Sequence, residues 1–222
     1  MNKNVLTKEL FNCDVPYLKD LFDNSTYPWD MLPKIKELIN HLLVTGIPGF
    51  SLLKEGVLVG KNVTISPTAT IIAPAIIGNN VEIRPGAYIR GYVITGDDCV
   101  LGNSSEFKNC ILLNHVQAPH YNYVGDSILG NFAHMGAGSI CSNLKSDGKN
   151  IVVHGNTDYE TGLRKIGGIL GDFADVGCQS VLNPGTVIGS HTQIYPLSMV
   201  RGVVPSYRIY KDKDNIVIKE KR

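Results

Sequence analysis

A period of six residues governs the sequence from Val59 to Val204 and limits the folds that the chain can adopt. Large, mostly apolar residues recur at every sixth position, and small or β-branched residues follow most of them four positions later. The first series is Val59, Ile65, Ile71, Ile77, Ile83, Ile89, Thr95, Leu101, Phe107 and Leu113. The same register returns at Leu129, Met135, Leu170, Val176, Leu182, Ile188, Ile194 and Val200. This spacing fits neither the period of an α-helix nor the two-residue alternation of an ordinary strand, so it predicts a parallel β-helix.

Each repeat of six residues supplies one short strand and one turn, so three repeats make a triangular coil of about eighteen residues. We expect the large residue to point into the axis of the prism and the small residue to lie near a corner, where space is tight. Glycine, asparagine, aspartate and proline follow many of the large residues, and these residue types suit turns. Successive coils would stack about 4.8 Å apart, with hydrogen bonds between their strands. The predicted fold class is therefore all-β.

The segments on either side of the repeat complete the predicted domain organisation, with the β-helix over residues 53–205. Residues 1–52 do not follow the period, and one face of their clearest helix carries Ile35, Leu38, Ile39 and Leu42. A solenoid exposes unpaired strand edges at its ends. We therefore interpret residues 1–52 as a mostly helical cap, or as a segment that packs on a neighbouring subunit. Residues 206–222 form a C-terminal tail in which a short strand is expected.

The period is interrupted twice, and both interruptions are interpreted as insertions. Four extra residues are expected near residues 114–122, because the step from Leu113 to the next residue in register, Tyr123, is ten. A longer insertion is expected near residues 142–169, between Cys141 and Leu170. Insertions leave a solenoid as loops from one corner and often form its binding face. The two interruptions are therefore the places where a functional site is expected.

Charge and composition exclude several kinds of partner. The formal net charge of +1 offers no electrostatic basis for binding nucleic acid or an anionic membrane, so neither is expected as a partner. The sequence contains no apolar run long enough to span a bilayer, and its first residues lack the apolar core of a signal peptide. We therefore expect a cytoplasmic protein. The five cysteines are odd in number and include no Cys-x-x-Cys pair, so neither a disulfide framework nor a zinc site is predicted.

An ordered set of short motifs occupies the middle of the repeat. In chain order they are Arg84-Pro85-Gly86, Glu106-Phe107-Lys108, Pro119-His120-Tyr121-Asn122-Tyr123-Val124-Gly125-Asp126, Met135-Gly136-Ala137-Gly138-Ser139 and Asn143. In this order they resemble the acetyltransferase part of the bifunctional bacterial enzyme that makes UDP-N-acetylglucosamine from glucosamine 1-phosphate. The resemblance covers the β-helix as architecture and is specific over about residues 84–149. It implies a left-handed β-helix, acetyl-CoA as co-substrate, an amino sugar phosphate as acceptor, and a homotrimer with sites between subunits.

The resemblance also implies roles for individual residues. The implied catalytic residues are His120, as general base, and Asn143. The implied acceptor-binding residues are Arg84, Lys108, Tyr123, His134 and Lys149. The implied acetyl-CoA-binding residues are Ala137, Gly138 and Cys178, and no metal is implied. The chemistry supports these roles independently, because acyl transfer to an amine needs a base, for which histidine is suited. Arginine and lysine in turn suit a phosphate, the first as a bidentate fork and the second as a point charge.

The sequence departs from the family pattern and leaves other functions open. Pro119 stands where the family has glycine, His134 stands where it has asparagine, and the nucleotidyltransferase part is absent from the sequence, so uridylyl transfer is not expected. One alternative is a non-catalytic β-helix, related to the C-terminal domains of sugar-1-phosphate nucleotidyltransferases, that binds a sugar phosphate or serves in assembly. Another is a metal-dependent hydrolase that uses His115, His120 and His134, although the Glu-x-Lys and Gly-Asp motifs argue against it.

Overall fold

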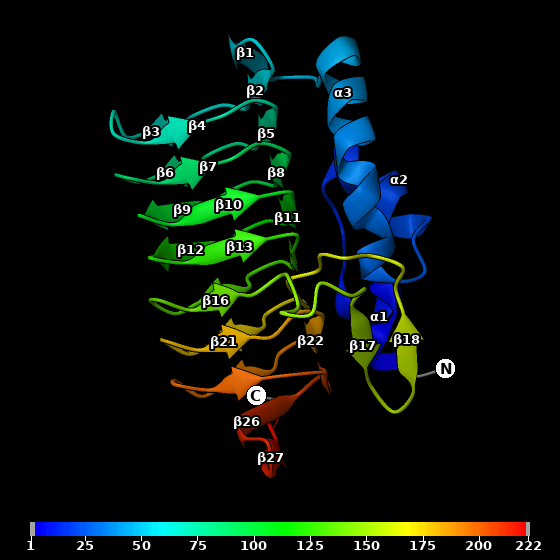
Figure 1. Ribbon diagram of the computed structural model, residues 1–222. Coiled ribbons are helices and arrows are strands. Elements are labelled where there is room, and N and C mark those ends of the chain that lie inside the picture. Colours follow the sequence, from blue (N-terminus) through cyan, green and yellow to red (C-terminus); the bar gives the residue numbers. More distant parts are fainter. Residues whose placement is uncertain (1–2, 221–222) are drawn as a thin grey trace.

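The computed structural model of the protein describes residues 3–220, so the outermost two residues of the predicted cap and of the predicted tail lie outside it. The strands stack as the coils of a parallel β-solenoid with three faces, formed by sheets A, B and C (Figure 1). The predicted fold class, an all-β parallel β-helix with a mostly helical N-terminal segment, is confirmed, and so is the left-handed sense that the family resemblance implies.

Each coil contributes one short strand to each sheet. Sheet A consists of β1 (Ser51–Lys54), β2 (Val57–Val59), β5 (Ala75–Ile77), β8 (Val93–Thr95), β11 (Cys110–Leu112), β14 (Ile128–Leu129), β19 (Gly168–Leu170), β22 (Thr186–Ile188) and β25 (Val203–Val204). Sheet B consists of β3 (Thr64–Ile65), β6 (Glu82–Ile83), β9 (Val100–Asn103), β12 (Gln117–His120), β15 (His134–Met135), β20 (Asp175–Val176), β23 (Gln193–Ile194), β26 (Arg208–Asp212) and β27 (Asn215–Ile218). Sheet C consists of β4 (Thr70–Ile71), β7 (Tyr88–Ile89), β10 (Glu106–Lys108), β13 (Tyr123–Gly125), β16 (Ile140–Cys141), β21 (Val181–Leu182) and β24 (Met199–Val200).

The large residues of the repeat fill the axis of the solenoid. Ile77, Phe107, Leu129 and Val176 are all fully buried in one continuous core cluster. Burying a side chain of this size stabilises the fold by roughly 1.5–3 kcal/mol. Antiparallel strands finish the stack, since β1 pairs with β2 and β27 pairs with β26 in that direction. The tail thus contributes a hairpin to the end of sheet B.

The structure differs from the expected insertion near residues 114–122. Leu112, and not Leu113, pairs with Thr95 and points into the axis. The coils here repeat after 17 residues, as between Asn114 and Asn131, whereas earlier coils repeat after 18. Relative to the period of six, one residue is missing between the axial residues Phe107 and Leu112, and none has been inserted. His120 therefore lies at the end of strand β12, paired with Asn103 of β9, and not in a loop.

The second interruption leaves the solenoid after β16 and returns at β19. It carries an antiparallel hairpin of β17 (Val152–His154) and β18 (Asp158–Glu160). Tyr159 of this hairpin contacts the rings of Tyr27 and Trp29 from the N-terminal segment, at centroid distances of 5.5 Å and 6.0 Å. The insertion and the N-terminal segment therefore pack together.

The N-terminal segment lies along one side of the solenoid and does not cap its end (Figure 1). Its elements are η1 (Lys3–Val5), α1 (Thr7–Leu10), α2 (Pro16–Asp23), η2 (Pro28–Lys34) and α3 (Ile35–Thr45). Helix α3 contacts β8, and the hairpin strand β17 contacts β22, so both cover the outer face of sheet A. Ile94, Ile128 and Ile169 point outward from this sheet and are fully buried beneath the cover. Within residues 3–220, the helices and the hairpin that cover sheet A leave sheets B and C uncovered.

The side of α3 that faces the solenoid should carry most of its contribution to stability. Ile39 on this helix is fully buried, whereas Val44 is 88 % exposed. We expect Ile39→Ala to lower the free energy of unfolding by about 2–4 kcal/mol, because it leaves a cavity between α3 and its neighbours. Val44→Ala should change it by no more than about 0.5 kcal/mol. Urea denaturation followed by circular dichroism compares the two, and equal midpoints would contradict the observed docking of α3.

Within residues 3–220, every helix is too short or too polar to cross a bilayer.

Candidate functional site

Polar side chains gather around Asp126 at the corner where sheet C turns into sheet A, here called the CA corner (residues Asn109, Asp126 and Asn143 of successive coils). Asp126 is 4 % exposed. Its carboxylate accepts hydrogen bonds from Nδ2 of Asn143 at 2.6 Å and from Nδ2 of Asn109 at 2.8 Å. Lys108 Nζ lies 3.4 Å from the same carboxylate. Asp126 thus holds side chains of the coils before and after its own in a fixed arrangement.

Tyr123 completes this network. Its hydroxyl oxygen accepts a hydrogen bond from Nδ2 of Asn143 at 3.1 Å, so both hydrogens of that amide are used within the cluster. A Cβ atom at Gly125 would collide with the Tyr123 hydroxyl and lie 2.9 Å from Asn143 Nδ2, which explains why glycine occupies this position. Burial raises the pKa of the Tyr123 phenol above its ordinary value. The hydroxyl therefore keeps its proton at neutral pH and can donate it to a ligand.

His120 lies at a different corner, where sheet B turns into sheet C, here called the BC corner (residues His120, Ala137 and Cys178 of successive coils). Gly138 N donates to the His120 carbonyl at 2.9 Å, and Gln179 N donates to the Ala137 carbonyl at 2.8 Å. The predicted base and the predicted acetyl-CoA-binding residues are therefore stacked coil upon coil. The His120 side chain is exposed.

A buried amide fixes the turn that carries His120. Asn122 is 3 % exposed, and its Oδ1 accepts a hydrogen bond from His120 N at 3.1 Å. Its Nδ2 donates to the Gly136 carbonyl of the next coil at 2.8 Å. Neither Asn122 nor Asp126 was assigned a role from the sequence, although both belong to the motif that contains His120. Each acts by joining coils, which the motif alone does not reveal.

The remaining predicted residues lie elsewhere. His134 on β15 shares a hydrogen bond of 2.8 Å with Asp175 on β20, and this bond lowers the pKa of the Asp175 carboxyl. Arg84, just after β6, makes a two-point ion pair with Glu82 at 3.0 Å and 3.1 Å. Lys149 lies in the insertion and is exposed. Across residues 3–220, no hydrogen bond or ion pair joins these three residues to the cluster around Asp126.

The two corners flank the same strands of sheet C. Strand β13 begins at Tyr123, just after the BC corner, and ends at Gly125, just before the CA corner. A strand of three residues is about 10 Å long, which is the scale of one sugar ring with a substituent. A ligand on sheet C could therefore contact His120 at one end and the Asp126 cluster at the other.

The histidines of the metal-site hypothesis do not come together. The His115 ring stacks on Phe132 at a centroid distance of 4.3 Å, at the corner between sheets A and B. His134 is paired with Asp175, as described above. In the part of the chain that the structure describes, no three histidine, cysteine, aspartate or glutamate side chains form a group that could hold a metal ion.

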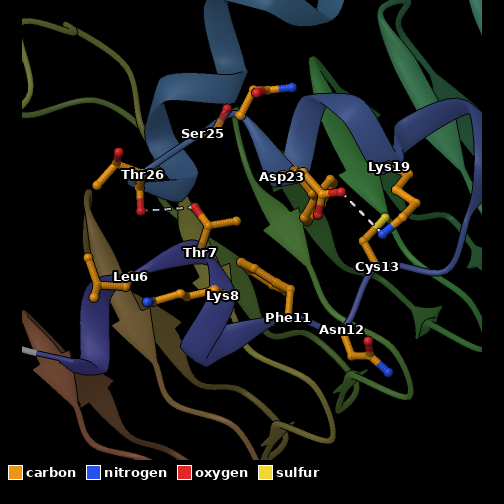
Figure 2. A pocket seen from close by; sticks show the side chains of 12 residues that line it. Leu6, Thr7, Lys8, Phe11, Asn12, Cys13, Lys19, Asp23, Ser25 and Thr26 are labelled. Atoms are coloured by element: carbon orange, nitrogen blue, oxygen red, sulfur yellow. Dashed lines mark hydrogen bonds and ion pairs between the residues drawn. The ribbon is translucent and has the colours of Figure 1, made fainter.

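A pocket of about 520 Å³ lies among the N-terminal helices, away from both corners (Figure 2). Lys19 and Asp23 form an ion pair of 3.2 Å in it, and Thr7 Oγ1 donates to the Thr26 carbonyl. None of the residues predicted to act in function lines this pocket. This pocket is therefore not the candidate functional site.

Comparison with known proteins bears on the family. The model of the GMPPB C-terminal domain family matches residues 71–160. A bifunctional protein GlmU from Methanococcus maripaludis is 34 % identical over 209 residues, which are 92 % of this chain and 51 % of that protein. A GlmU from Methanococcus aeolicus is 32 % identical over 198 residues, which are 88 % of this chain and 48 % of that protein. The chain thus spans about half the length of the curated relatives it matches.

The solved structures that match this chain are more distant from it in sequence. A point mutant of AntD, an N-acyltransferase from Bacillus cereus in complex with dTDP and coenzyme A, is 23 % identical. The match covers 74 % of this chain and 83 % of that chain, with a TM-score of 0.41, which is too low to support an argument about activity. The chain has the hexapeptide-repeat, left-handed β-helix fold and is similar to the acetyltransferase part of the GlmU proteins.

Proposed function

We propose that the protein transfers the acetyl group of acetyl-CoA to the amine of an amino sugar phosphate such as glucosamine 1-phosphate. The network that holds Lys108, Tyr123 and Asn143 around the buried Asp126 is the observation that carries this proposal. It presents a cation at the end of β10, a phenol at the start of β13, next to the corner that carries His120, and an amide just after β16. Similarity to proteins named bifunctional GlmU supports the same reaction class.

In this proposal His120 is the general base. As the amine nitrogen attacks the thioester carbonyl, a C–N bond forms and the C–S bond breaks. His120 takes the proton that the nitrogen loses, and the departing CoA thiolate then takes up a proton. The imidazole of His120 is exposed, so it can reach a ligand. The hydrogen bond from His120 N to Asn122 fixes the backbone from which the imidazole extends.

Asn143 and Tyr123 orient the acceptor. Both hydrogens of the Asn143 amide are used by Asp126 and Tyr123, so its Oδ1 is left to accept a hydrogen bond from the acceptor amine or a hydroxyl. The Tyr123 hydroxyl accepts from Asn143 and therefore directs its own proton toward a ligand. Lys108 is partly neutralised by Asp126 at 3.4 Å and supplies a further donor.

The BC corner fits the co-substrate. Within residues 3–220, the backbone N–H groups of Ala137 and Cys178 have no hydrogen-bond acceptor, while both carbonyls are paired. These residues are stacked on adjacent coils, so the two N–H groups are about 4.8 Å apart along the solenoid. Unpaired amides at this spacing are suited to the amide carbonyls of the pantetheine arm of acetyl-CoA.

The proposal includes a homotrimer. Sheet A is covered by the N-terminal segment and the insertion, whereas sheet C and the BC corner expose apolar side chains, namely Ile140, Leu197 and Met199. Exposed apolar patches of this kind mark contacts between proteins. The mass measured by light scattering on a sizing column tests the assembly, and a monomer would contradict it.

Release of thiol from acetyl-CoA in the presence of glucosamine 1-phosphate tests the proposed reaction. We expect turnover that depends on both substrates, with N-acetylglucosamine 1-phosphate as the product identified by mass spectrometry. A protein that binds glucosamine 1-phosphate but releases no thiol with any amino sugar phosphate would favour the non-catalytic alternative.

A further inference from the structure

The return arm of the insertion is attached directly to the CA corner. Ile166 N donates to the Asn143 carbonyl at 3.1 Å, and Gly167 N donates to the Asp126 carbonyl at 2.7 Å. Lys165 forms an antiparallel bridge with Leu144, the residue after Asn143. The backbone of residues 164–167 is therefore held beside the two side chains at the centre of the candidate site.

A pocket opens at this junction, with a volume of about 490 Å³. Its polar lining includes Asn109 and Asp126 from the solenoid and Arg164 and Lys165 from the insertion. Segment η2 contributes an apolar wall through Pro33 and its neighbour in the chain. Three separate parts of the sequence thus meet around one cavity, and the cavity shares Asp126 with the network that holds Asn143 and Tyr123.

The charge of this pocket is predominantly positive. Neither Arg164 nor Lys165 forms an ion pair within residues 3–220, and both are exposed. Arg164 Nε donates to the Gly148 carbonyl at 3.2 Å, which fixes the guanidinium plane and leaves its terminal nitrogens available. The carboxylate of Asp126 is already balanced by Lys108 and by two amide donors. The two cations of the insertion are therefore not compensated and favour an anion.

We propose that Arg164 and Lys165 form a subsite that binds the phosphate group of the acceptor, with the arginine as a hydrogen-bonding fork and the lysine as a point charge. This inference rests on the proposed function for the identity of the acceptor. The acceptor phosphate is favoured over the phosphates of CoA, because the pocket adjoins Asn143 at the CA corner, whereas the amides suited to pantetheine lie at the BC corner. The insertion therefore completes the site as well as covering sheet A.

The double variant Arg164→Ala/Lys165→Ala tests this subsite through a comparison of two acceptors. We expect the KM for glucosamine 1-phosphate to rise by about tenfold or more, because two charge-assisted contacts are lost. The KM for glucosamine, which has no phosphate, and both kcat values should stay within about twofold. An equal change for both acceptors, or no change for either, would overturn the proposal. The single variant Lys165→Glu, at an exposed position, should also raise the KM for glucosamine 1-phosphate and leave the KM for glucosamine unchanged.

The matched control is Lys211→Ala/Lys213→Ala, which removes two exposed cations from the hairpin of β26 and β27. It should leave both KM values unchanged. Calorimetric titration with glucosamine 1-phosphate, without acetyl-CoA, measures the affinity of the subsite independently of catalysis. If the wild type binds this ligand and the double variant loses about tenfold in affinity, the subsite stands even where no acetyl transfer occurs. If the wild type does not bind it, or if the double variant loses affinity for CoA instead, the subsite is wrong.

Discussion

Replacing His120 by alanine is expected to lower kcat for acetyl transfer by about two orders of magnitude or more, since a positioned general base typically contributes a factor of that size. The side chain is exposed and its neighbours are held by Asn122, so the fold should survive the change. The KM values for acetyl-CoA and for the acceptor should change little, because the base acts on the reacting nitrogen and not on the groups that bind the substrates. Thiol release under saturating substrates measures the effect.

His41→Ala is the matched control, because His41 is an exposed histidine on α3 and lies outside both corners. It should leave kcat within about twofold of the wild type. Added imidazole should restore part of the activity of His120→Ala, because the vacated space can admit a small base. If His120→Ala keeps more than about a tenth of the wild-type kcat, another group removes the proton and the assignment of the base is wrong.

The fold could be predicted largely because the axis of the solenoid accepts only one kind of pattern. Ile77, Phe107 and Val176 all occupy the buried positions that the period of six assigned to them. The prediction failed between Leu112 and Leu113, where both residues are apolar. Leu112 lies in the axis and Leu113 beneath the N-terminal segment, so either register would bury a leucine. A strand that is buried on both faces carries no alternation from which its register could be determined.

The prediction that the N-terminal segment caps the end of the solenoid was wrong for a related reason. Its amphipathic helix was predicted, but the surface on which it packs was not recognised. The signal was present in the sequence, because apolar residues stand just before the axial residue in every third repeat. These outward residues are Leu58, Ile76, Ile94, Ile111, Ile128, Ile169 and Val187, all buried. Such a column of outward apolar residues predicts that another segment covers this face of the solenoid. A segment that capped the end of the solenoid would not need an apolar face on sheet A.

The motifs supplied individual candidate residues, but they did not indicate the contacts between them. The motifs supplied Lys108, Tyr123 and Asn143, which the structure joins into one network. Asp126, whose carboxylate joins them, belongs to the motif that contains His120, but the motif alone does not indicate its role. Contacts between coils depend on how many residues each coil contains, and one residue was miscounted at Leu112. The location of Arg164 and Lys165 beside Asp126 could not be predicted from the sequence, because it depends on where the insertion rejoins the solenoid.

Replacing Asp126 by alanine is expected to lower kcat/KM for the acceptor by more than tenfold and to destabilise the fold. The change leaves Nδ2 of Asn143, Nδ2 of Asn109 and the Lys108 ammonium without their shared acceptor. These donors are only partly buried, so the loss of each partner costs at most about 1–3 kcal/mol. Asn143 also loses the bond that directs its Oδ1 outward, so its amide can turn away from the acceptor. Asp126→Asn keeps one acceptor oxygen and should therefore be milder in both respects.

Asp172 provides the matched control, because it plays the same structural part at the corner between sheets A and B. It is 8 % exposed and accepts hydrogen bonds from the backbone of Asn12 and Asn131 at 2.8 Å. Asp172→Ala should lower the melting temperature to an extent comparable to Asp126→Ala, yet leave kcat/KM within about twofold. A destabilising change alone then cannot account for lost activity at Asp126. If the two variants lose activity in proportion to their melting temperatures, Asp126 only stabilises the solenoid and does not position Asn143 for the reaction.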